Sequence, residues 1–444
     1  MLSVLTNRTY RHLLAAQVIA LVGTGLATVA LGLLAYEIAG TDAGAVLGTA
    51  LAIKMVAYIG IAPVVGAYAD RLPRKTLLVA MDVVRAVVAM VLPFVDAVWQ
   101  IYLLIFLLQS ASAAFTPTFQ ATIPDILPDE EEYTTALSLS RLAYDLESLL
   151  SPILAAALLT VINFHWLFAG TSVGFVISAM LVVTSALPHR QAAKKIVESV
   201  WRKTTRGARI YLRTPRLVGL LAVTLAAAAG SAMVIVNTVV IVKGMGRSQE
   251  DVALALAAYG GGSMLAALIL PRVLRSISDR SVMIAGAFLL TATLSVFAMM
   301  TLGTAGLIAW PFLLGGWLVL GVTYSLSVTP GGRLLRRSSN EGDRPALFAA
   351  QFALSHVCWL LAYPVAGQIG ANSGMGVAFS ALAAIAAIGA ISALWLWPKV
   401  DPEEIAHEHP ELPSDHPHLS RQFPGEHRHA FVIDELHGRW PGRP

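Results

Sequence analysis

Cysteine and charge are both scarce in this chain. Its 444 residues include a single cysteine, Cys358, and only 13% are Asp, Glu, Lys or Arg. One thiol excludes an intrachain disulfide, so stability does not depend on an oxidising compartment. A soluble protein covers its surface with polar side chains, and a sequence that is 56% hydrophobic leaves too few of them. The scarcity of charge therefore indicates a membrane protein.

Long hydrophobic runs make up most of the sequence. A helix needs about 20 apolar residues to cross a bilayer, and we count twelve such runs: 12–36, 44–66, 76–95, 98–118, 136–162, 165–187, 217–242, 252–272, 281–302, 306–329, 346–370 and 375–397. Lipid offers no partners to backbone groups, so these runs are predicted to be α-helices. The first run lacks an A-x-A exit, and we expect no cleaved signal peptide. The predicted fold class is an all-α membrane protein.

Positive charge is unevenly distributed among the connections. Lys and Arg cluster in the N-terminus and in alternate connections, which predicts a bacterial inner-membrane protein with both termini cytoplasmic. The net charge of +4 follows from this topology, and without interleaved aromatics it predicts no nucleic-acid partner. The expected partners are the lipid bilayer, a small inorganic cation or small-molecule substrate, and protons, and we expect a functional monomer.

One long polar insertion, 188–216, divides the runs six and six. Ile196, Val200 and Trp201 recur at helical spacing among basic residues, which predicts an amphipathic helix on the membrane surface. The predicted organisation is an N-terminal six-helix bundle, a cytoplasmic linker with this amphipathic helix, a C-terminal six-helix bundle and a His-rich, disordered cytoplasmic tail: 1–187, 188–216, 217–397 and 398–444.

The two halves show traces of repetition. Asp70 and Asp279, each followed by arginine, stand 209 residues apart, and Pro152 and Pro364 stand 212 apart. Two markers with nearly the same offset favour a duplicated six-helix unit, which is how many secondary transporters are built.

The connection between the second and third runs carries a recognisable motif. GAYADRLPRK resembles the G-x-x-x-D-R-x-G-R-K loop of the major facilitator superfamily, with proline in place of the second glycine. The resemblance implies two pseudo-symmetric six-helix bundles. A glycine permits close helix approach, and an acid beside cations can form a latch. The predicted gating residues are therefore Gly66, Asp70, Arg71 and Arg74. The alternative is that the basic residues of this loop only anchor it on the cytoplasmic side.

The fifth run departs from the superfamily pattern. Residues 121–142 resemble the enterobactin- and macrolide-exporter branch, and drug antiporters usually carry G-x-x-x-G-P-x-x-G-G in helix 5. Here Glu147 replaces the first glycine, while Pro152 is kept. An ionised carboxylate in mid-bilayer costs on the order of 2.5–3.5 kcal/mol. Glu147 must therefore be paired, hydrated, bound to a cation, or protonated and hydrogen-bonded to backbone or to Lys54.

Two more acids lie inside the runs. Asp82 has Arg85 one turn away, which we interpret as a structural ion pair. Asp145 has Arg141 one turn earlier, but Glu147 points to the opposite side of the helix, so one arginine cannot neutralise both acids.

His356 lies in the eleventh run, and the offset of 212 residues makes it equivalent to Tyr144, next to Asp145. The family resemblance implies that helices 5 and 11 flank a central cavity. Imidazole and carboxylate suit nickel, cobalt or zinc, although a lone buried histidine is more often structural. The predicted substrate and proton site comprises Asp145, Glu147, His356, Arg141, Tyr144 and Lys54, with the first three as metal ligands.

The tail is rich in histidine and proline. In an extended chain, residues i and i+2 fall on one face, so each His-x-His pair offers two imidazoles to one ion. The predicted tail metal ligands are His407, His409, His416, His418, His427, His429 and His437. The alternative is a solvated, disordered end without a metal.

These features predict a transporter and not an enzyme. The His-rich C-terminus resembles those of nickel-resistance-type exporters of the superfamily. The sequence contains no Walker loop, so we do not expect ATP to be the energy source. The first prediction is a proton-coupled antiporter that exports a divalent metal, nickel first and cobalt or zinc next, without a resident cofactor. Two alternatives stay open: export of a drug or siderophore-like compound, and a membrane-bound metal sensor whose helices only scaffold the tail.

Overall fold

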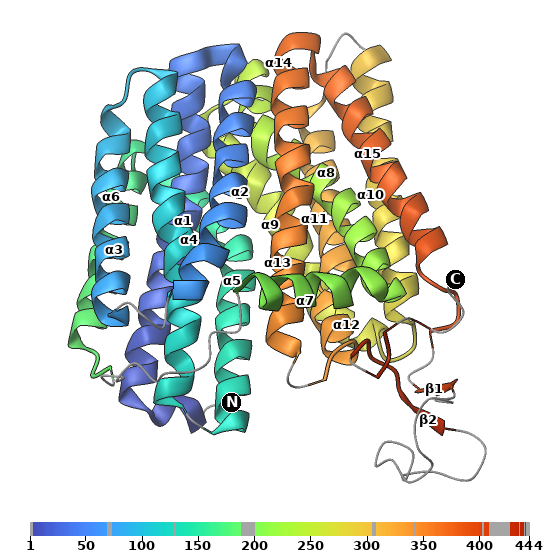
Figure 1. The fold of residues 1–444 in the computed structure, drawn as a ribbon. Coiled ribbons are helices and arrows are strands. Elements are labelled where there is room, and N and C mark those ends of the chain that lie inside the picture. The colour runs from blue at the N-terminus through green and yellow to red at the C-terminus, as the bar shows by residue number, and fades with distance from the viewer. Residues whose placement is uncertain are drawn as a thin grey trace.

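Twelve helices of 18 residues or more dominate the described part of the chain. The computed structural model describes residues 3–68, 73–127, 129–187, 200–303, 308–340, 343–401, 404–407, 427–434, 436–438 and 440. The long helices in these ranges are α1 (Arg8–Ala39), α2 (Ala43–Tyr68), α3 (Arg74–Val91), α4 (Val98–Ile126), α5 (Glu130–Leu159), α6 (His165–Thr184), α8 (Pro215–Gly244), α9 (Gln249–Val273), α10 (Asp279–Gly303), α11 (Trp310–Val328), α13 (Arg344–Pro364) and α15 (Met375–Leu396) (Figure 1).

Shorter elements connect these helices. They are η1 (Ser3–Thr6), η2 (Gly40–Asp42), η3 (Leu92–Phe94), α7 (Val200–Arg213), α12 (Gly331–Arg337), the π-helical η4 (Val365–Ile369) and α14 (Gly370–Ser373). In the tail, β1 (Glu404–His407) pairs antiparallel with β2 (His427–Ala430), and His407 stands opposite His427. This hairpin is small, and the prediction of an all-α architecture is confirmed for the membrane body.

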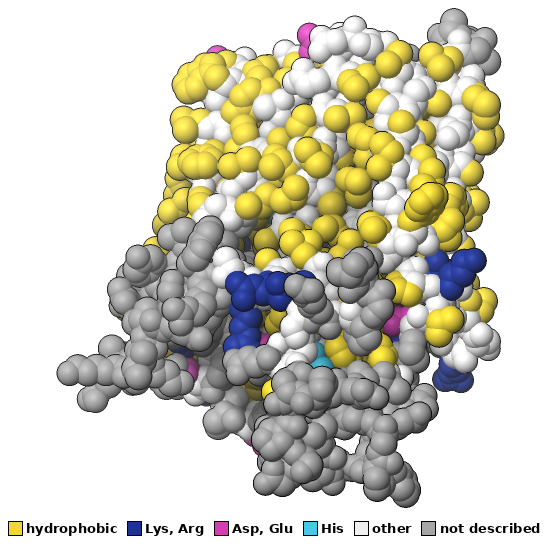
Figure 2. Space-filling model, turned by 45° about the vertical axis from the view of Figure 1, so that its right-hand side comes forward, with side chains coloured by type: hydrophobic (Ala, Val, Ile, Leu, Met, Phe, Trp, Pro, Cys, Tyr) yellow, Lys and Arg dark blue, Asp and Glu magenta, His cyan; other side chains and the backbone are white. Residues whose placement is uncertain are grey.

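Ten segments of the described chain are long and apolar enough to span a membrane. The first of them, Arg8–Ala62, contains α1 and most of α2. Hydrophobic side chains cover most of the face seen in Figure 2, and Lys and Arg side chains gather along its lower border. This banding is what a bilayer imposes, because charged side chains are stable only beyond its hydrocarbon.

Local sequence explains where helices begin and end. The Asn7 side chain accepts hydrogen bonds from the backbone N–H groups of Thr9 and Tyr10, which caps the start of α1. Gly40, with φ of 55°, ends the same helix in a conformation that residues with a Cβ avoid. Ser248 and Asp251 form a capping box at the start of α9.

The helices pack as two sets with a narrow meeting zone. In the first set α1 packs on α5 and α6, and α4 packs on α2 and α3; in the second, α11 packs on α9, and α15 packs on α8 and α10. Between the sets, α2 contacts α13 and η4, and α5 contacts α9 (Figure 1). The meeting zone is therefore formed mainly by α2, α5, α9 and α13.

The linker helix α7 is held on α13. A Cβ added to Gly207 would lie 2.1 Å from the Ala346 carbonyl oxygen, so the two backbones touch. Arg206 Nε lies 2.7 Å from Asp343 Oδ1, which adds an ion pair to this contact. Ile196 of the predicted amphipathic segment lies outside the described residues. α7 thus belongs structurally to the C-terminal set of helices.

Candidate functional site

Glu147 occupies the middle of α5, where α5 meets α1. A Cβ added to Gly25 of α1 would lie 2.7 Å from Glu147 Oε1 and 2.0 Å from Ser151 Oγ. Glycine at position 25 therefore provides the space that these two polar side chains fill. Van der Waals contact with Gly25 fixes the position of the carboxylate without neutralising it.

Lys54 of α2 is the cation that faces this carboxylate. The charges of Lys54 and Glu147 interact, but no direct salt bridge between them is present among the described residues. Lys54 Nζ lies 6.0 Å from the centroid of the Tyr58 ring on the same helix. The lysine thus acts on Glu147 electrostatically, without a direct salt bridge to it in the described part of the chain.

His356 of α13 joins this group from the other half. Its ring stacks on Tyr58 with centroids 5.3 Å apart and planes 13° apart, and it lies 4.0 Å from the Phe352 ring. His356 Nδ1 lies 2.6 Å from the Phe352 carbonyl oxygen. A carbonyl only accepts hydrogen bonds, so Nδ1 carries a hydrogen, and in the neutral form of the ring Nε2 keeps a lone pair.

Lys54 also acts electrostatically on His356, so the lysine is the common neighbour of Glu147 and His356. Three of the six predicted site residues are therefore brought together: Lys54, Glu147 and His356. Arg141, Tyr144 and Asp145 belong to α5, and their side chains lie outside the described part of the structure. Within the described residues no cluster of three His, Cys, Asp or Glu side chains forms a metal site.

Sequence reasoning missed three tyrosines that meet in the C-terminal half. The rings of Tyr259 on α9 and Tyr324 on α11 have centroids 5.9 Å apart, and Tyr363 on α13 interacts with both. The Tyr363 carbonyl oxygen would lie 2.6 Å from a Cβ at Gly48 of α2. Three helices supply these residues, so no local pattern could have predicted the group.

The two halves touch backbone to backbone at the end of the molecule near α14 (top of Figure 1). A Cβ at Gly367 would lie 2.2 Å from the Gly44 carbonyl oxygen. Gln368 Nε2 donates across the halves to Thr49 Oγ1 at 3.2 Å, and within the second half Asn237 Nδ2 of α8 donates to the Ala366 carbonyl oxygen at 2.9 Å. These contacts join the two halves at this end of the molecule.

The predicted gating motif is only partly described. Asp70 and Arg71 lie outside the described residues, and Gly66 lies in α2. Arg74 forms an ion pair with Asp125 of α4, so it ties α3 to α4 within the first half. The role of this motif as a gate stays a prediction.

Asp82 and Arg85 form the buried pair expected from their spacing. Ser178 Oγ of α6 donates to Asp82 Oδ2 at 2.8 Å. The Arg85 guanidinium lies 4.2 Å from the Phe115 ring and 4.6 Å from the Phe175 ring. These contacts connect α3, α4 and α6, which supports a structural role.

The histidines of the tail fall into three groups. His409, His416 and His418 lie outside the described residues. His407, His427 and His429 are described through the backbone of β1 and β2 alone. His437 is buried, and its Nδ1 lies 2.9 Å from Asp434 Oδ1. Its ring meets Phe431 edge-on at 4.7 Å, which is the packing of a structural residue.

Asp434 is the acceptor that organises this turn. The backbone N–H groups of Leu436 and His437 donate to Asp434 Oδ1 at 2.9 and 2.8 Å. Partial burial raises the pKa of Asp434, but the hydrogen bonds from His437 and Leu436 outweigh it and lower the pKa to about 2. The carboxylate is therefore ionised at any ordinary pH.

Arg216, at the start of α8, anchors the tail. It donates to Ser338 Oγ at 2.8 Å, to Asp401 Oδ1 at 3.1 Å and to the Phe431 carbonyl oxygen at 3.2 Å. Its guanidinium lies 4.9 Å from the Trp440 ring. Phe431 and Trp440 are buried in the main hydrophobic core. The predicted disorder of the tail therefore does not describe these residues, because they pack on the protein.

Comparison with known families decides the fold. The family model of the Major Facilitator Superfamily matches residues 13–246 and 219–423. The chain belongs to the major facilitator superfamily. It is an integral membrane transporter and not an enzyme. The family resemblance of the loop motif and the predicted fold are thereby confirmed.

Relatives with curated names share part of the chain. Macrolide efflux protein A of Streptococcus pyogenes is 27% identical over 153 residues, which cover 33% of this chain and 38% of that protein. The protein of the same name from Enterococcus faecalis is 26% identical over 152 residues, covering 32% and 47%. The matched region thus spans less than half the length of these relatives.

Solved structures agree over most of the chain. The nucleoside transporter NupG superposes with a TM-score of 0.67 at 14% identity, over 88% of this chain and 100% of that one. A D-xylose-proton symporter gives a TM-score of 0.63 at 15% identity, over 88% and 98%. At such identities these structures show the fold alone.

Proposed function

We propose that this transporter is a proton-coupled exporter of an amphipathic organic compound. The names of the related macrolide efflux proteins support this cargo class. Tyr58 of α2 and Phe352 of α13 supply apolar surface against His356, and Lys54, one turn from Tyr58, acts on the carboxylate of Glu147. We further propose a monomer in the bacterial inner membrane, with both termini in the cytoplasm, as the distribution of Lys and Arg predicts.

The observation that carries the proposal is that Lys54 and Glu147 interact electrostatically without a direct salt bridge between them in the described structure. A carboxylate in the membrane needs a positive partner, and Lys54, a proton or a cationic group of the cargo can each serve. Competition among these three positive partners links the movement of protons to the movement of the cargo. Binding of a cargo cation to Glu147 releases Lys54, and later protonation of Glu147 releases the cargo.

His356 extends this exchange to the other half. Its Nε2 lone pair is an acceptor for a hydroxyl or ammonium group of the cargo, and its stack on Tyr58 spans α2 and α13. A cargo molecule that inserts between these rings would separate α2 from α13. Cargo binding would in this way promote the change between inward- and outward-open states.

Export of a divalent metal, nickel first, is the second candidate. The antiparallel pairing of His407 with His427 favours it, because each of these residues is followed two positions later in the sequence by another histidine, His409 and His429. Cobalt and zinc suit the same ligand types. In this version the tail collects the ion, and His356 with Glu147 and Asp145 passes it across the membrane.

Transport into everted membrane vesicles distinguishes the candidates. We expect a labelled macrolide or cationic dye to accumulate in vesicles with an acidic lumen, and labelled Ni²⁺ to stay outside. Glu147→Gln should abolish the accumulation, while the control Glu250→Gln, in the first turn of α9, should retain it. Gradient-driven uptake of Ni²⁺ without uptake of organic compounds would instead establish the metal exporter. Nickel binding without any transport would favour the sensor.

A further inference from the structure

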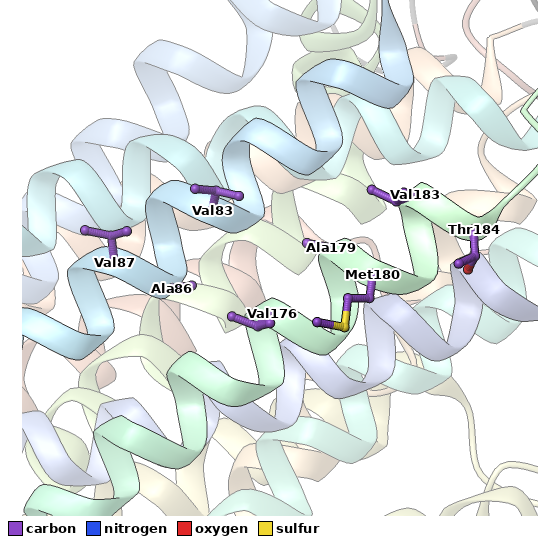
Figure 3. Close-up of a pocket in the computed structure, with 8 residues that line it drawn as sticks. All are labelled: Val83, Ala86, Val87, Val176, Ala179, Met180, Val183 and Thr184. Carbon is purple, nitrogen blue, oxygen red and sulfur yellow. The ribbon is translucent and has the colours of Figure 1, made fainter.

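A hollow of about 460 Å³ lies between α3 and α6 (Figure 3). Its main walls are Val83 and Val87 of α3 and Val176, Met180 and Val183 of α6. These five side chains are between 40% and 60% exposed, although all are apolar. A surface of this kind is stable only against another apolar group, and in this position the neighbour is membrane lipid.

A second hollow of about 370 Å³ continues the first along α3. Val183 lines both, and the second is otherwise formed by Lys75, Thr76, Val79 and Ala80. The character of the walls therefore changes from wholly apolar at Val87 to cationic at Lys75. Lys75 Nζ donates one hydrogen bond, to the Ser185 carbonyl oxygen at 3.0 Å, and an ammonium group has three hydrogens to donate.

The length of the combined groove matches one leaflet. From Lys75 to Val87 the helix rises by about 18 Å at 1.5 Å per residue. Half of the hydrocarbon core of a bilayer is about 15 Å thick. A fatty-acyl chain that lies beside Val87, Val83 and Val79 would therefore bring its headgroup to the level of Lys75.

The floor of the groove is rigid. Ser172 Oγ of α6 donates to the Ala86 carbonyl oxygen of α3 at 2.8 Å, and Ser178 Oγ donates to Asp82. These buried hydrogen bonds fix the spacing between α3 and α6 before any ligand arrives. A preformed groove binds with a smaller loss of conformational freedom than one that must open.

We propose that this groove is a binding site for one anionic phospholipid. One acyl chain lies between α3 and α6, and the phosphate of the headgroup pairs with Lys75. The positive charge at one end and the apolar walls along the rest of the groove together select this ligand class over a soluble anion or a neutral lipid. The site is on the outer face of the first helical set, so it is separate from Glu147 and His356.

Native mass spectrometry of the detergent-purified full chain tests the site. With phosphatidylglycerol as the probe, we expect one lipid per chain to survive detergent washing that removes other lipids. Val176→Trp fills the groove and should reduce this occupancy about tenfold, the ratio that corresponds to about 1.4 kcal/mol of binding free energy. The matched control Val173→Trp changes an exposed valine of the same helix that does not line the groove, and should retain the lipid.

The headgroup is tested separately. Wild-type protein should bind phosphatidylglycerol in preference to phosphatidylcholine, and Lys75→Gln should remove this preference. Lys399→Gln, an exposed lysine in the other half, should leave it intact. Equal occupancy in wild type and Val176→Trp, or no retained lipid in wild type, would refute the site. A preference that survives Lys75→Gln would refute the assignment of the headgroup.

Discussion

Buried Arg216 and half-buried Lys54 of this transporter differ in how their charges are partnered. Arg216 is held by Ser338, Asp401 and the Phe431 carbonyl, with an aromatic ring against its face. Lys54 interacts with Glu147 only at a distance and has no direct salt bridge to it among the described residues. Saturated hydrogen bonding makes a charge a fixed part of the structure, whereas a loosely partnered charge can exchange its partner.

The sharpest test of this contrast is the charge at position 147. Glu147→Gln should reduce gradient-driven transport to the level of empty vesicles and leave the melting temperature in detergent unchanged or higher. Lys54→Gln alone should lower the melting temperature, since it leaves a buried carboxylate without a cation. The double variant Glu147→Gln/Lys54→Gln should restore the melting temperature of the wild-type protein. If the two effects simply added, the charges would not be coupled.

At the fixed site, the main effect should be on folding. Arg216→Ala removes one partner of a buried ion pair with Asp401, which typically costs about 3–5 kcal/mol. We expect a lower melting temperature and proteolytic release of the tail, measured on the purified chain. The control Arg209→Ala, at an exposed position of α7, should melt like wild type. An unchanged melting temperature for Arg216→Ala would show that the tail is not anchored there.

A smaller change at Gly25 tests whether Glu147 is positioned by packing. Gly25→Ala places a methyl group against Ser151 and Glu147, and overpacking of this kind costs about 1–3 kcal/mol. Transport should fall although no charge has changed. Gly60→Ala meets no atom within 4 Å and serves as the control. Equal transport by both variants would mean that the carboxylate tolerates displacement.

The smallest expected effect concerns pH and the tail. Because the pKa of Asp434 is lowered to about 2 in the folded protein, its ionisation stabilises the docked tail above the unfolded pKa of about 3.9. This contribution is lost as pH falls from about 4 toward 2. Trp440 fluorescence should report the release, and Asp434→Asn should weaken docking at neutral pH and remove this acid-dependent step.

The sequence predicted the elements governed by local pattern. Hydrophobic length located the twelve long helices, and the spacing of Asp82 and Arg85 predicted their pair. Glu147 stood out because a carboxylate is costly in hydrocarbon. These features depend on residues that are close in the chain or on the membrane itself.

Features that depend on distant residues were not predicted. The stack of His356 on Tyr58 joins residues from different halves, and no spacing along the chain indicates it. Phe431, Ile433 and Trp440 lie in a mostly polar tail, yet all three are buried. Arg216, which the sequence places more than 200 positions earlier, contacts Phe431 and Trp440.

The contact between Gly44 and Gly367 has a consequence for the kinetics of transport. At this point the backbones of α2 and η4 meet directly, and beside them Gln368 Nε2 of η4 donates to Thr49 Oγ1 of α2, so separation of the halves breaks both contacts. Dispersion attraction between two backbones loses about a quarter to a half of its strength when a gap of about 0.5–1 Å opens between them. This end of the transporter should consequently behave as a two-position switch, with no stable half-open intermediate through which protons or ions could leak.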